Sequence, residues 1–504
     1  MSQHASGPAA DDLPEQMRVR REKRDRMLAS GIEPYPVGFP RTATVAEVRS
    51  AHPDLPPDTA TGQRVGVTGR VMLARNTGRL CFATLRDGTG DLQVMLSLDR
   101  VGEESLTAWK HEVDLGDHVG VEGEVVTSRR GELSVLVDRW AVTAKCLRPL
   151  PEKHKGLTDP EARVRQRYVD LIVNAESREM VRTRSTVVRS IRDSMQQRGF
   201  TEVETPMLQV VHGGANARPF RTHINAYGMD LFLRIAPELY LKRLVVGGLE
   251  KVFEINRNFR NEGADSSHNP EFTMLEAYEA YGDYGTVREL TRELIQAAAT
   301  AAYGEPVARR VPHDGGPVSE HDLSGSWPVV TVNDALSAAL GEQVGADTTV
   351  DELRKLCDRA GVPYDPAWGR GPVLLEMYEH LVEDRTTDPT FYTDFPTEVS
   401  PLTRQHRDDP RLAERWDLVA FGAEMGTGYS ELVDPVVQRE RLEAQSLLAA
   451  GGDHEAMAVD EDFLRALEYA MPPSGGMGMG IDRLLMMLTG RNIRETVLFP
   501  LVKP

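Results

Sequence analysis

The chain has 504 residues, a formal net charge of −18 and three widely spaced cysteines. Its length exceeds what one hydrophobic core usually organises, so two or three domains are expected. The sequence has no apolar run long enough to span a membrane, no secretory signal pattern at its start and no paired cysteines, which favours a cytoplasmic protein without a disulfide framework or a membrane partner.

Residues 1–60 are expected to form an N-terminal extension with a basic helix. The acidic total argues against general nucleic-acid binding, yet six Arg and Lys residues lie between positions 18 and 26. The segment 15–29 has a helix-forming composition, and Gly31 and Pro34 end it. The charge either covers a solvated helix face or contacts a polyanion such as an RNA backbone.

Residues 61–147 contain short strand-like segments separated by turns, with a helical stretch near 103–111. Five short strands with one inserted helix predict an OB-fold barrel, which binds single-stranded nucleic acid on aromatic side chains. Phe82 is the candidate stacking residue, although strand aromatics are more often core. Polar side chains that can assist it follow nearby: Arg75, Gln93 and Glu132.

A linker at 148–176 leads to a second domain, expected at 177–504. Residues 177–199 carry apolar side chains at helical spacing, and a short strand follows up to Pro206. The pattern leaves open whether this helix packs on its own core or on another subunit. Further on, a helix begins at Pro237 with Glu238 in its first turn, where the helix dipole favours a carboxylate.

The segment 252–280 predicts two strands joined by a polar loop that Pro270 closes. Alternation of side chains along the second strand puts four residues on one face: Phe272, Met274, Glu276 and Tyr278. One hairpin can therefore present an arginine, an aromatic ring, a carboxylate and a phenol to one cleft. A solvated polar face is the alternative for this segment taken alone.

Residues 300–395 are expected to form a helical insertion without chemistry. Beyond it, Asp417 and Glu424 are candidate ligands for magnesium, an ion that prefers oxygen. A straight strand would separate them by about 23 Å. They can share an ion only if the chain reverses between them, most simply at Gly422.

The C-terminal stretch GGMGMGIDRLL places glycines before a helix that begins at 481–482, with Arg483 in its first turn. A glycine-rich strand before a helix N-terminus can bind phosphate. The GK[ST] sequence of a P-loop and the downstream carboxylate of a dinucleotide fingerprint are both missing.

Phe259-Arg260-Asn261-Glu262, His268 and Glu271-Phe272-Thr273-Met274 together resemble motif 2 of the class II aminoacyl-tRNA synthetases, and RNFRNEG…HNPEFTMLE is most similar to the lysyl member. The helix and strand at 177–206 resemble motif 1, which forms the homodimer interface in that family, and GMGIDR resembles motif 3. The likeness covers residues from about 61 to 504. It implies an α+β fold, with an OB-fold barrel before a catalytic antiparallel sheet flanked by helices.

The resemblance implies that lysine attacks the α-phosphate of ATP, with Mg²⁺ present, and that the lysyl group passes from the adenylate to the terminal ribose of tRNA(Lys). It assigns ATP to Arg260, Glu262, His268, Asn269, Phe272 and Arg483, with Arg260 and Arg483 catalytic. It assigns lysine to Glu238, Arg260, Glu276, Tyr278, Thr427, Tyr429 and Glu431. It assigns the metal to Asp417 and Glu424, and the anticodon to Arg75, Phe82, Gln93 and Glu132.

The charge of the pocket supports the lysyl assignment. A cationic substrate side chain needs buried anions, which Glu276 and Glu431 would supply, whereas an aspartate site would need a cation. Two residues depart from the lysyl family: Asp417 stands where glutamate is common, and Thr427 where asparagine is common. Weaker metal or lysine binding is the expected consequence.

Three alternatives stay open. A catalytically silent RNA-binding homologue would lack one of Arg260, Glu262, His268 or Arg483, and all are present. A lysyl transferase acting on protein would lack the anticodon barrel. Residues 414–457 also resemble the synthetase half of actinobacterial proteins that make lysylphosphatidylglycerol, which carry an added membrane domain not expected here. A paralogue that supplies Lys-tRNA for lipid lysylation would differ only in the destination of the lysyl group.

Overall fold

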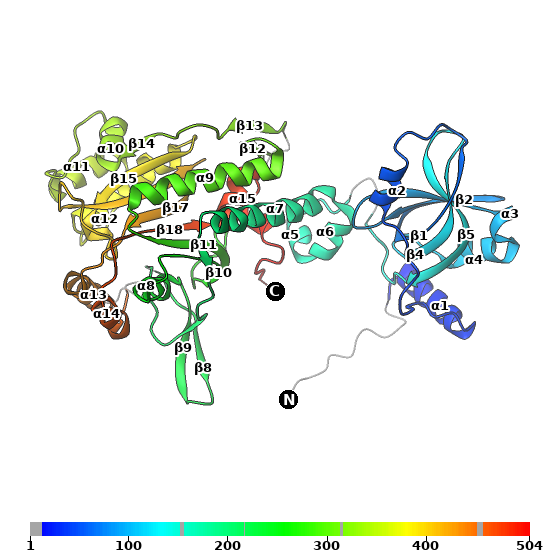
Figure 1. Ribbon diagram of the computed structural model, residues 1–504, viewed down its shortest axis with the longest axis horizontal. Coiled ribbons are helices and arrows are strands. Elements are labelled where there is room, and N and C mark those ends of the chain that lie inside the picture. The colour runs from blue at the N-terminus through cyan, green and yellow to red at the C-terminus, as the bar shows by residue number, and fades with distance from the viewer. Residues whose placement is uncertain (1–12, 152–155, 216, 313–315, 451–456, 504) are drawn as a thin grey trace. The chain divides into compact units, whose positions relative to one another are not determined.

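A computed structural model describes residues 13–151, 156–215, 217–312, 316–450 and 457–503 (Figure 1). The chain divides into two compact units, Met1–Leu157 and Thr158–Pro504. The division falls inside the segment expected as a linker, because the short helices α5 (Pro160–Arg165) and α6 (Arg167–Val173) belong to the second unit. Within the described ranges, no helix is both long and apolar enough to cross a bilayer.

The first unit is built around a closed barrel with the strand order β1-β2-β3-β5-β4 in its described residues. The strands are β1 (Ala60–Thr77), β2 (Leu80–Arg86), β3 (Asp91–Ser97), β4 (His118–Thr127) and β5 (Leu133–Ala144). The helices α3 (Leu98–Val101) and α4 (Glu103–Glu112) lie between β3 and β4, and α2 (Val45–Ala51) precedes the barrel. The OB-fold prediction, including its inserted helix, is confirmed.

Helix α1 (Glu15–Ala29) has the predicted bounds, but part of its charge is used inside the first unit. Arg20 is buried and donates hydrogen bonds to backbone carbonyl oxygens of the barrel, including that of Cys146. Lys23 forms an ion pair with Asp114 at 2.7 Å. Contact with a polyanion stays a prediction, and it falls on the basic side chains of α1 that remain exposed, Arg18, Arg21 and Arg26.

The second unit is built on an eight-stranded sheet, as far as its residues are described, with the order β14-β15-β16-β17-β18-β11-β10-β6. These strands are β6 (Thr201–Glu202), β10 (Lys251–Phe259), β11 (Glu271–Ala280), β14 (Val329–Thr331), β15 (Thr390–Pro396), β16 (Leu412–Ala420), β17 (Ala423–Ser430) and β18 (Ser474–Gly480). The expected antiparallel sheet is present, but its edge strands β6 and β14 run parallel to their neighbours. A separate small sheet holds β7 (Leu208–Gln209), β8 (Arg221–Ile224) and β9 (Met229–Leu233).

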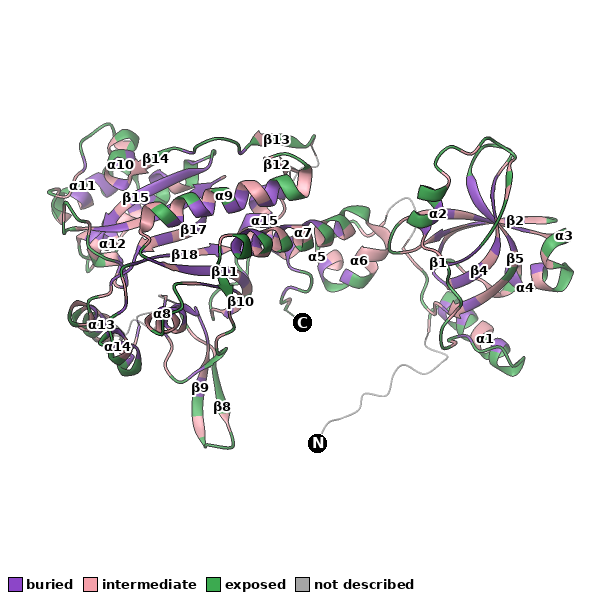
Figure 2. Cartoon of the chain, viewed as in Figure 1, coloured by how far each residue is buried: buried purple, intermediate pink, exposed green. Residues whose placement is uncertain are grey.

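Helices cover both faces of the large sheet (Figure 1). One face packs under α7 (Ala175–Gln197), α9 (Tyr284–Tyr303) and α15 (Ile481–Thr489), and the other under α8 (Glu238–Val246) and α14 (Glu461–Leu467). Phe253 joins the first core and its neighbour Val252 the second, as the alternation of a strand requires. Figure 2 shows the buried residues concentrated in the strands of the barrel and of the sheet.

The apolar stripe of α7 packs on the core of its own chain. Val187, Ile191 and Met195 are fully buried there beside residues of α9 and the sheet. This face of the helix is therefore not what a second subunit would contact.

The segment 300–395 is more than the helical insertion that we expected. It holds α10 (Val332–Leu340), α11 (Val350–Ala360) and α12 (Arg370–Leu381), which share a core with β15. It also holds β12 (Val307–Arg310), β13 (Ser319–Asp322) and the sheet strands β14 and β15. Strand β15 is almost entirely buried, so it lacks the alternation that marks a strand in sequence.

Candidate active site

A cavity of about 410 Å³ opens in the second unit, on the face of the sheet that carries α8. Its lining includes most of the predicted site residues: Glu238, Arg260, Glu262, His268, Asn269, Phe272, Glu276, Tyr278, Glu424, Thr427, Tyr429 and Arg483. Asp417 and Glu431 do not line it. Asp417 lies behind Thr427, and Glu431 lies behind Glu238, to which a buried lysine connects it.

The β10–β11 hairpin supplies one wall. Its strands pair antiparallel with Glu254 opposite Glu276, so the predicted strands and loop are confirmed. Phe272, Met274, Glu276 and Tyr278 all line the cavity from β11, as the period of two predicts.

At one end of the cavity, two guanidinium groups flank an aromatic ring and an imidazole. The guanidinium carbon of Arg260 lies 5.1 Å from the ring centre of Phe272. Arg483 donates to the carbonyl oxygen of Glu424 at 2.9 Å and lies 3.5 Å from Nε2 of His268. Burial lowers the pKa of Arg260, a cost that a bound anion would offset. This end therefore has the groups that a flat base and a phosphate require.

The glycine-rich stretch does not form a phosphate loop. Gly476 and Gly478 lie within β18, and β18 pairs with both β11 and β17. A Cβ atom on Gly476 would lie 2.0 Å from Oε1 of Glu431, and one on Gly478 would lie 3.2 Å from Cε of Met274. The glycines are needed because side chains of the site lie flat across this strand.

The opposite end of the cavity is acidic. Glu276 is buried, and the hydroxyl of Tyr278 donates to its Oε2 at 3.4 Å. Burial, reinforced by the charge of Glu238, raises the pKa of Glu276 well above its usual value, against the opposing charge of Arg260. Burial also raises the pKa of Glu431, while its ion pair opposes that rise. These carboxylates would be held in the charged form by a cationic ligand.

Sequence reasoning missed Lys242, a fully buried residue of α8. Its Nζ lies 2.7 Å from Oε1 of Glu238 and 2.5 Å from Oε2 of Glu431. Burial alone would lower the pKa of Lys242, but the charges of Glu238 and Glu431 raise it above its usual value. Its spacing of four residues from Glu238 was the available signal, since such pairs share a helix face.

A second acidic group lies where β16 turns into β17. Phe421 and Gly422 take positive φ angles of 54° and 73°, and the chain reverses there as predicted. Arg415 pairs with both oxygens of Asp417, at 2.9 and 2.7 Å. The hydroxyl of Thr427 also donates to Asp417, at 2.6 Å. The two departures from the lysyl family thus form one hydrogen-bonded unit.

Glu424 lies in the same acidic group. Burial and the charge of Asp417 raise its pKa, against the charge of Arg483. Glu383, which follows α12, accepts a hydrogen bond from the backbone N–H of Glu424 at 3.2 Å, and burial together with the charge of Glu424 raises its pKa to about 8. Glu383 was not predicted, and its position shows that the segment 300–395 borders this acidic group.

The donor set of this group fits magnesium. Buried carboxylates that lie close together are stabilised by a divalent cation, and oxygen is the ligand that Mg²⁺ prefers. Within the described residues, no group of three or more His, Cys, Asp or Glu side chains could hold a metal ion by itself.

On the barrel, Phe82 lies on the outer face and not in the core. Its strand neighbours Cys81 and Ala83 are buried, and Phe82 pairs with Arg75 on β1 and Met95 on β3. Gln93 lies two residues from Met95 on β3, opposite Thr84, and donates to Oγ of Ser134 at 2.9 Å. Glu132 projects from the β4–β5 turn, 3.7 Å from Arg49. A surface that can stack and read bases is therefore present, and its role in anticodon binding stays a prediction.

Comparison with known families matches both units. Residues 159–503 match a family described as tRNA synthetases class II (D, K and N), and residues 65–143 match the OB-fold nucleic acid binding domain.

The chain is similar in sequence to two kinds of curated protein. It is 58% identical to the "Lysine--tRNA ligase" of Mycobacterium tuberculosis (strain ATCC 25177 / H37Ra) over 507 residues, which cover 99% of each protein. It is 60% identical to the "Lysylphosphatidylglycerol biosynthesis bifunctional protein LysX" of Mycobacterium marinum over 492 residues, 98% of this chain and 44% of that protein. The LysX of Gordonia bronchialis is 58% identical over 97% of this chain and 42% of its own length. The chain thus spans less than half the length of these bifunctional relatives.

Proposed function

The chain belongs to the class II tRNA synthetases of the D, K and N group, and from this premise we propose that it is a cytoplasmic lysine–tRNA ligase. The OB-fold unit and the similarity to mycobacterial lysine--tRNA ligases over 99% of both proteins support the proposal. Its substrates are L-lysine, ATP and tRNA(Lys).

The observation that carries the substrate assignment is the acidic end of the cavity. Glu238 and Glu276 line it, Glu431 lies directly behind, and Arg260 stands at the other end. A diamino acid brings two ammonium groups and one carboxylate, which match this arrangement. An acidic side chain would face buried carboxylates and be rejected, because like charges in a closed site cost several kcal/mol.

The chain's residues then perform the first step by positioning. Arg260 holds the lysine carboxylate against the α-phosphate, because its planar fork pairs with oxyanions through two bonds. Phe272 stacks on the adenine, Arg483 covers the other side and Glu262 takes the exocyclic amino group. His268, with Asn269 beside it, meets the outer phosphates. Mg²⁺, when bound through Glu424 and Asp417, neutralises charge on the phosphates.

At the amino-acid end, Glu238 holds the α-ammonium group and Glu276 with Glu431 holds the distal one. Tyr278 orients Glu276 through its hydroxyl. Thr427 and Tyr429 line the side of the cavity between the two ends. Lysine is thereby fixed with its carboxylate toward the α-phosphate, and this orientation converts the attack into an effectively unimolecular step.

Exchange of ATP with labelled pyrophosphate, measured with each of the twenty amino acids, tests the proposal. Lysine should support exchange, and no acidic amino acid should. Exchange with aspartate in place of lysine would refute the substrate assignment.

Recognition of tRNA(Lys) is proposed for the outer face of the barrel. Phe82 would stack on an anticodon base, with Arg75, Gln93 and Glu132 contacting its edges and the neighbouring phosphate. Phe82→Ala should weaken tRNA charging by about tenfold or more, since one stacked base contributes roughly 1–3 kcal/mol. Adenylate formation, which needs no tRNA, is the internal control. Equal loss in both reactions would indicate misfolding instead.

A homodimer is also proposed, with an interface near motif 1. Strand β6 forms an edge of the large sheet, and exposed apolar side chains follow it: Met207, Leu208 and Val210. Open strand edges and clustered apolar side chains are typical of surfaces that pair with another chain. Light scattering should give twice the mass of one chain, and a monomer at micromolar concentration would refute this part.

Supply of Lys-tRNA for lipid lysylation is a second candidate, favoured by the similarity to LysX over 98% of this chain. The charging reaction is the same in both cases. Depleting the protein in its native cell separates them: a selective loss of lysylated phosphatidylglycerol, with bulk Lys-tRNA unchanged, supports the second candidate. A catalytically silent homologue is excluded by any lysine-dependent exchange.

A further inference from the structure

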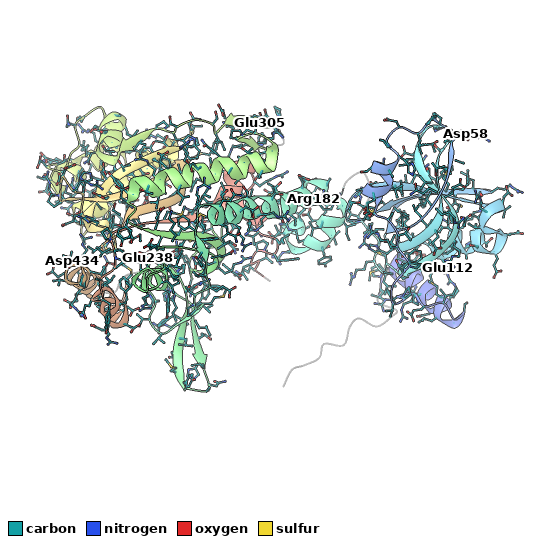
Figure 3. The ribbon with its side chains drawn as sticks, in the orientation of Figure 1. Asp58, Glu112, Arg182, Glu238, Glu305 and Asp434 are labelled. Carbon is teal, nitrogen blue, oxygen red and sulfur yellow. The ribbon has the colours of Figure 1, made fainter. Side chains whose placement is uncertain are left out.

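Lys242 lies beneath the acidic end of the cavity, although it does not line it. Its side chain is completely buried, and it contacts carboxylates from two distant parts of the chain. Glu238 opens α8, and Glu431 follows β17. Figure 3 labels Glu238 beside the α8 ribbon, one helical turn before Lys242.

The two contacts leave room for a ligand. Lys242 takes Oε1 of Glu238, so the second oxygen of this cavity-lining carboxylate is available to a further donor. Lys242 also lies 2.5 Å from Oε2 of Glu431. Among the described residues, no other donor bonds either oxygen of Glu431. One internal cation thus holds both carboxylates in place, and each carboxylate can still accept a bond from a ligand.

The bridge through Lys242 also fixes where the two carboxylates lie relative to each other. Gly476 lets Glu431 lie against β18, and Tyr278 flanks the same place, so the carboxylate of Glu431 has little freedom. A single ammonium at 2.7 and 2.5 Å ties this carboxylate to that of Glu238. The distance between the subsites for the two ends of a diamino acid is therefore fixed by Lys242.

Lys242 also affects the net charge of the site. Glu238, Glu276 and Glu431 are opposed by Lys242 and by Arg260, which leaves one net negative charge. Lysine carries one net positive charge, so the complex is neutral. Without Lys242 the complex would bury an unbalanced carboxylate, which is strongly unfavourable.

From this geometry we propose that Lys242 is a positioning residue that sets substrate chain length: it fixes the spacing of the carboxylates of Glu238 and Glu431 so that lysine fits and ornithine, one methylene shorter, does not. The inference rests on the proposed lysine activation and names a determinant of its selectivity.

The test is Lys242→Met, an uncharged side chain of similar length. The wild-type enzyme should prefer lysine to ornithine by about 10–200-fold in kcat/KM for pyrophosphate exchange, the range that one methylene supplies. In the variant, this preference should fall about tenfold or more, KM for lysine should rise by a similar factor and KM for ATP should stay within about twofold. An unchanged preference in the folded variant overturns the proposal.

Two further variants serve as controls. Arg243→Met removes the neighbouring cation of α8, which pairs with Asp460 at 2.7 Å, and should leave the preference unchanged. Lys242→Met combined with Glu431→Gln removes one charge of each sign and should recover thermal stability while selectivity stays lost. If selectivity returns with stability, Lys242 is only structural. If the wild-type enzyme does not activate lysine, the proposed function itself fails, an outcome distinct from both.

Discussion

The cavity holds two acidic groups that are built differently. In the first, Glu238 and Glu431 share the ammonium of Lys242, and Glu276 accepts a weak contact from Tyr278. In the second, Arg415 pairs with both oxygens of Asp417, whereas burial and the charge of Glu424 raise the pKa of Glu383.

The difference indicates what each group receives. With Arg260 counted, the first group has one positive charge too few for a neutral site, and in the proposed function the net charge of lysine would supply it. In the second, buried carboxylates lie close together beside the arginines of the proposed nucleotide end. Divalent cations that bind together with phosphates typically occupy such an environment. In the proposed function, one cavity would thus separate an organic cation from a metal ion by how its carboxylates are already paired.

Arg260 connects the two groups, since the charges of Glu424 and Glu276 both act on it. Arg260→Lys keeps the charge but loses the two-pronged geometry. Exchange with lysine should fall by about 10²–10³-fold, as expected for a lost oxyanion contact. Arg257→Lys on the other face of β10, where Arg257 lies 3.8 Å from Glu271, is the matched control and should change the rate by less than about twofold. Equal losses in both variants would contradict the role of Arg260.

Glu276→Gln removes one anion from the first group without changing its shape. KM for lysine should rise by about 30–5,000-fold, because truncating one partner of a buried charge contact costs roughly 2–5 kcal/mol. KM for ATP should not change. Glu279→Gln, on the other face of β11 and paired with Lys251 at 2.6 Å, serves as the control. A rise in both KM values would mean that the two groups are not separate.

Glu424→Gln should act only on the second group. The magnesium concentration that half-activates exchange should rise by about 10–100-fold, the usual effect of altering a metal site's supporting groups. Lysine binding measured by calorimetry without ATP or magnesium should remain as in the wild type. Unchanged magnesium dependence would remove Glu424 from the metal site.

Glu383→Gln is expected to act on stability. The pKa of Glu383 is raised from 4.5 to about 8, so the folded state holds a proton there that the unfolded state loses. Stability from this group is present below about pH 4.5 and is lost as the pH rises toward 8, with a slope of at most about 1.4 kcal/mol per pH unit. Denaturant titrations in chelator should show a flatter pH profile for the variant. Identical profiles would contradict the buried, protonated state of Glu383.

The hairpin of β10 and β11 could be predicted from sequence because its chemistry lies on consecutive alternating residues. The meeting of Asp417 with Glu424 was also predictable, since Gly422 marks the turn. Arg415 was missed although it lies two residues from Asp417 on the same strand face, which the period of two would have shown.

Other features depend on contacts across the fold. The pairing of Lys242 with Glu431 joins residues far apart in sequence, and no local pattern encodes it. The approach of Glu383 to Glu424 depends on how α12 packs against β15 and β16. Likewise, the short parallel edge strands β6 and β14 carry too few residues to show a period.

The central claim is that the pocket selects a distal ammonium group. Norleucine tests it most directly, because it has the length of lysine's carbon chain without the terminal charge. A site built to pair with a polar group rejects an analogue lacking it by about 10⁴-fold or more, so norleucine should support almost no ATP–pyrophosphate exchange at concentrations that saturate with lysine. Exchange with norleucine within about tenfold of lysine would contradict the account, since a pocket that tolerates it is selecting for shape and not for charge.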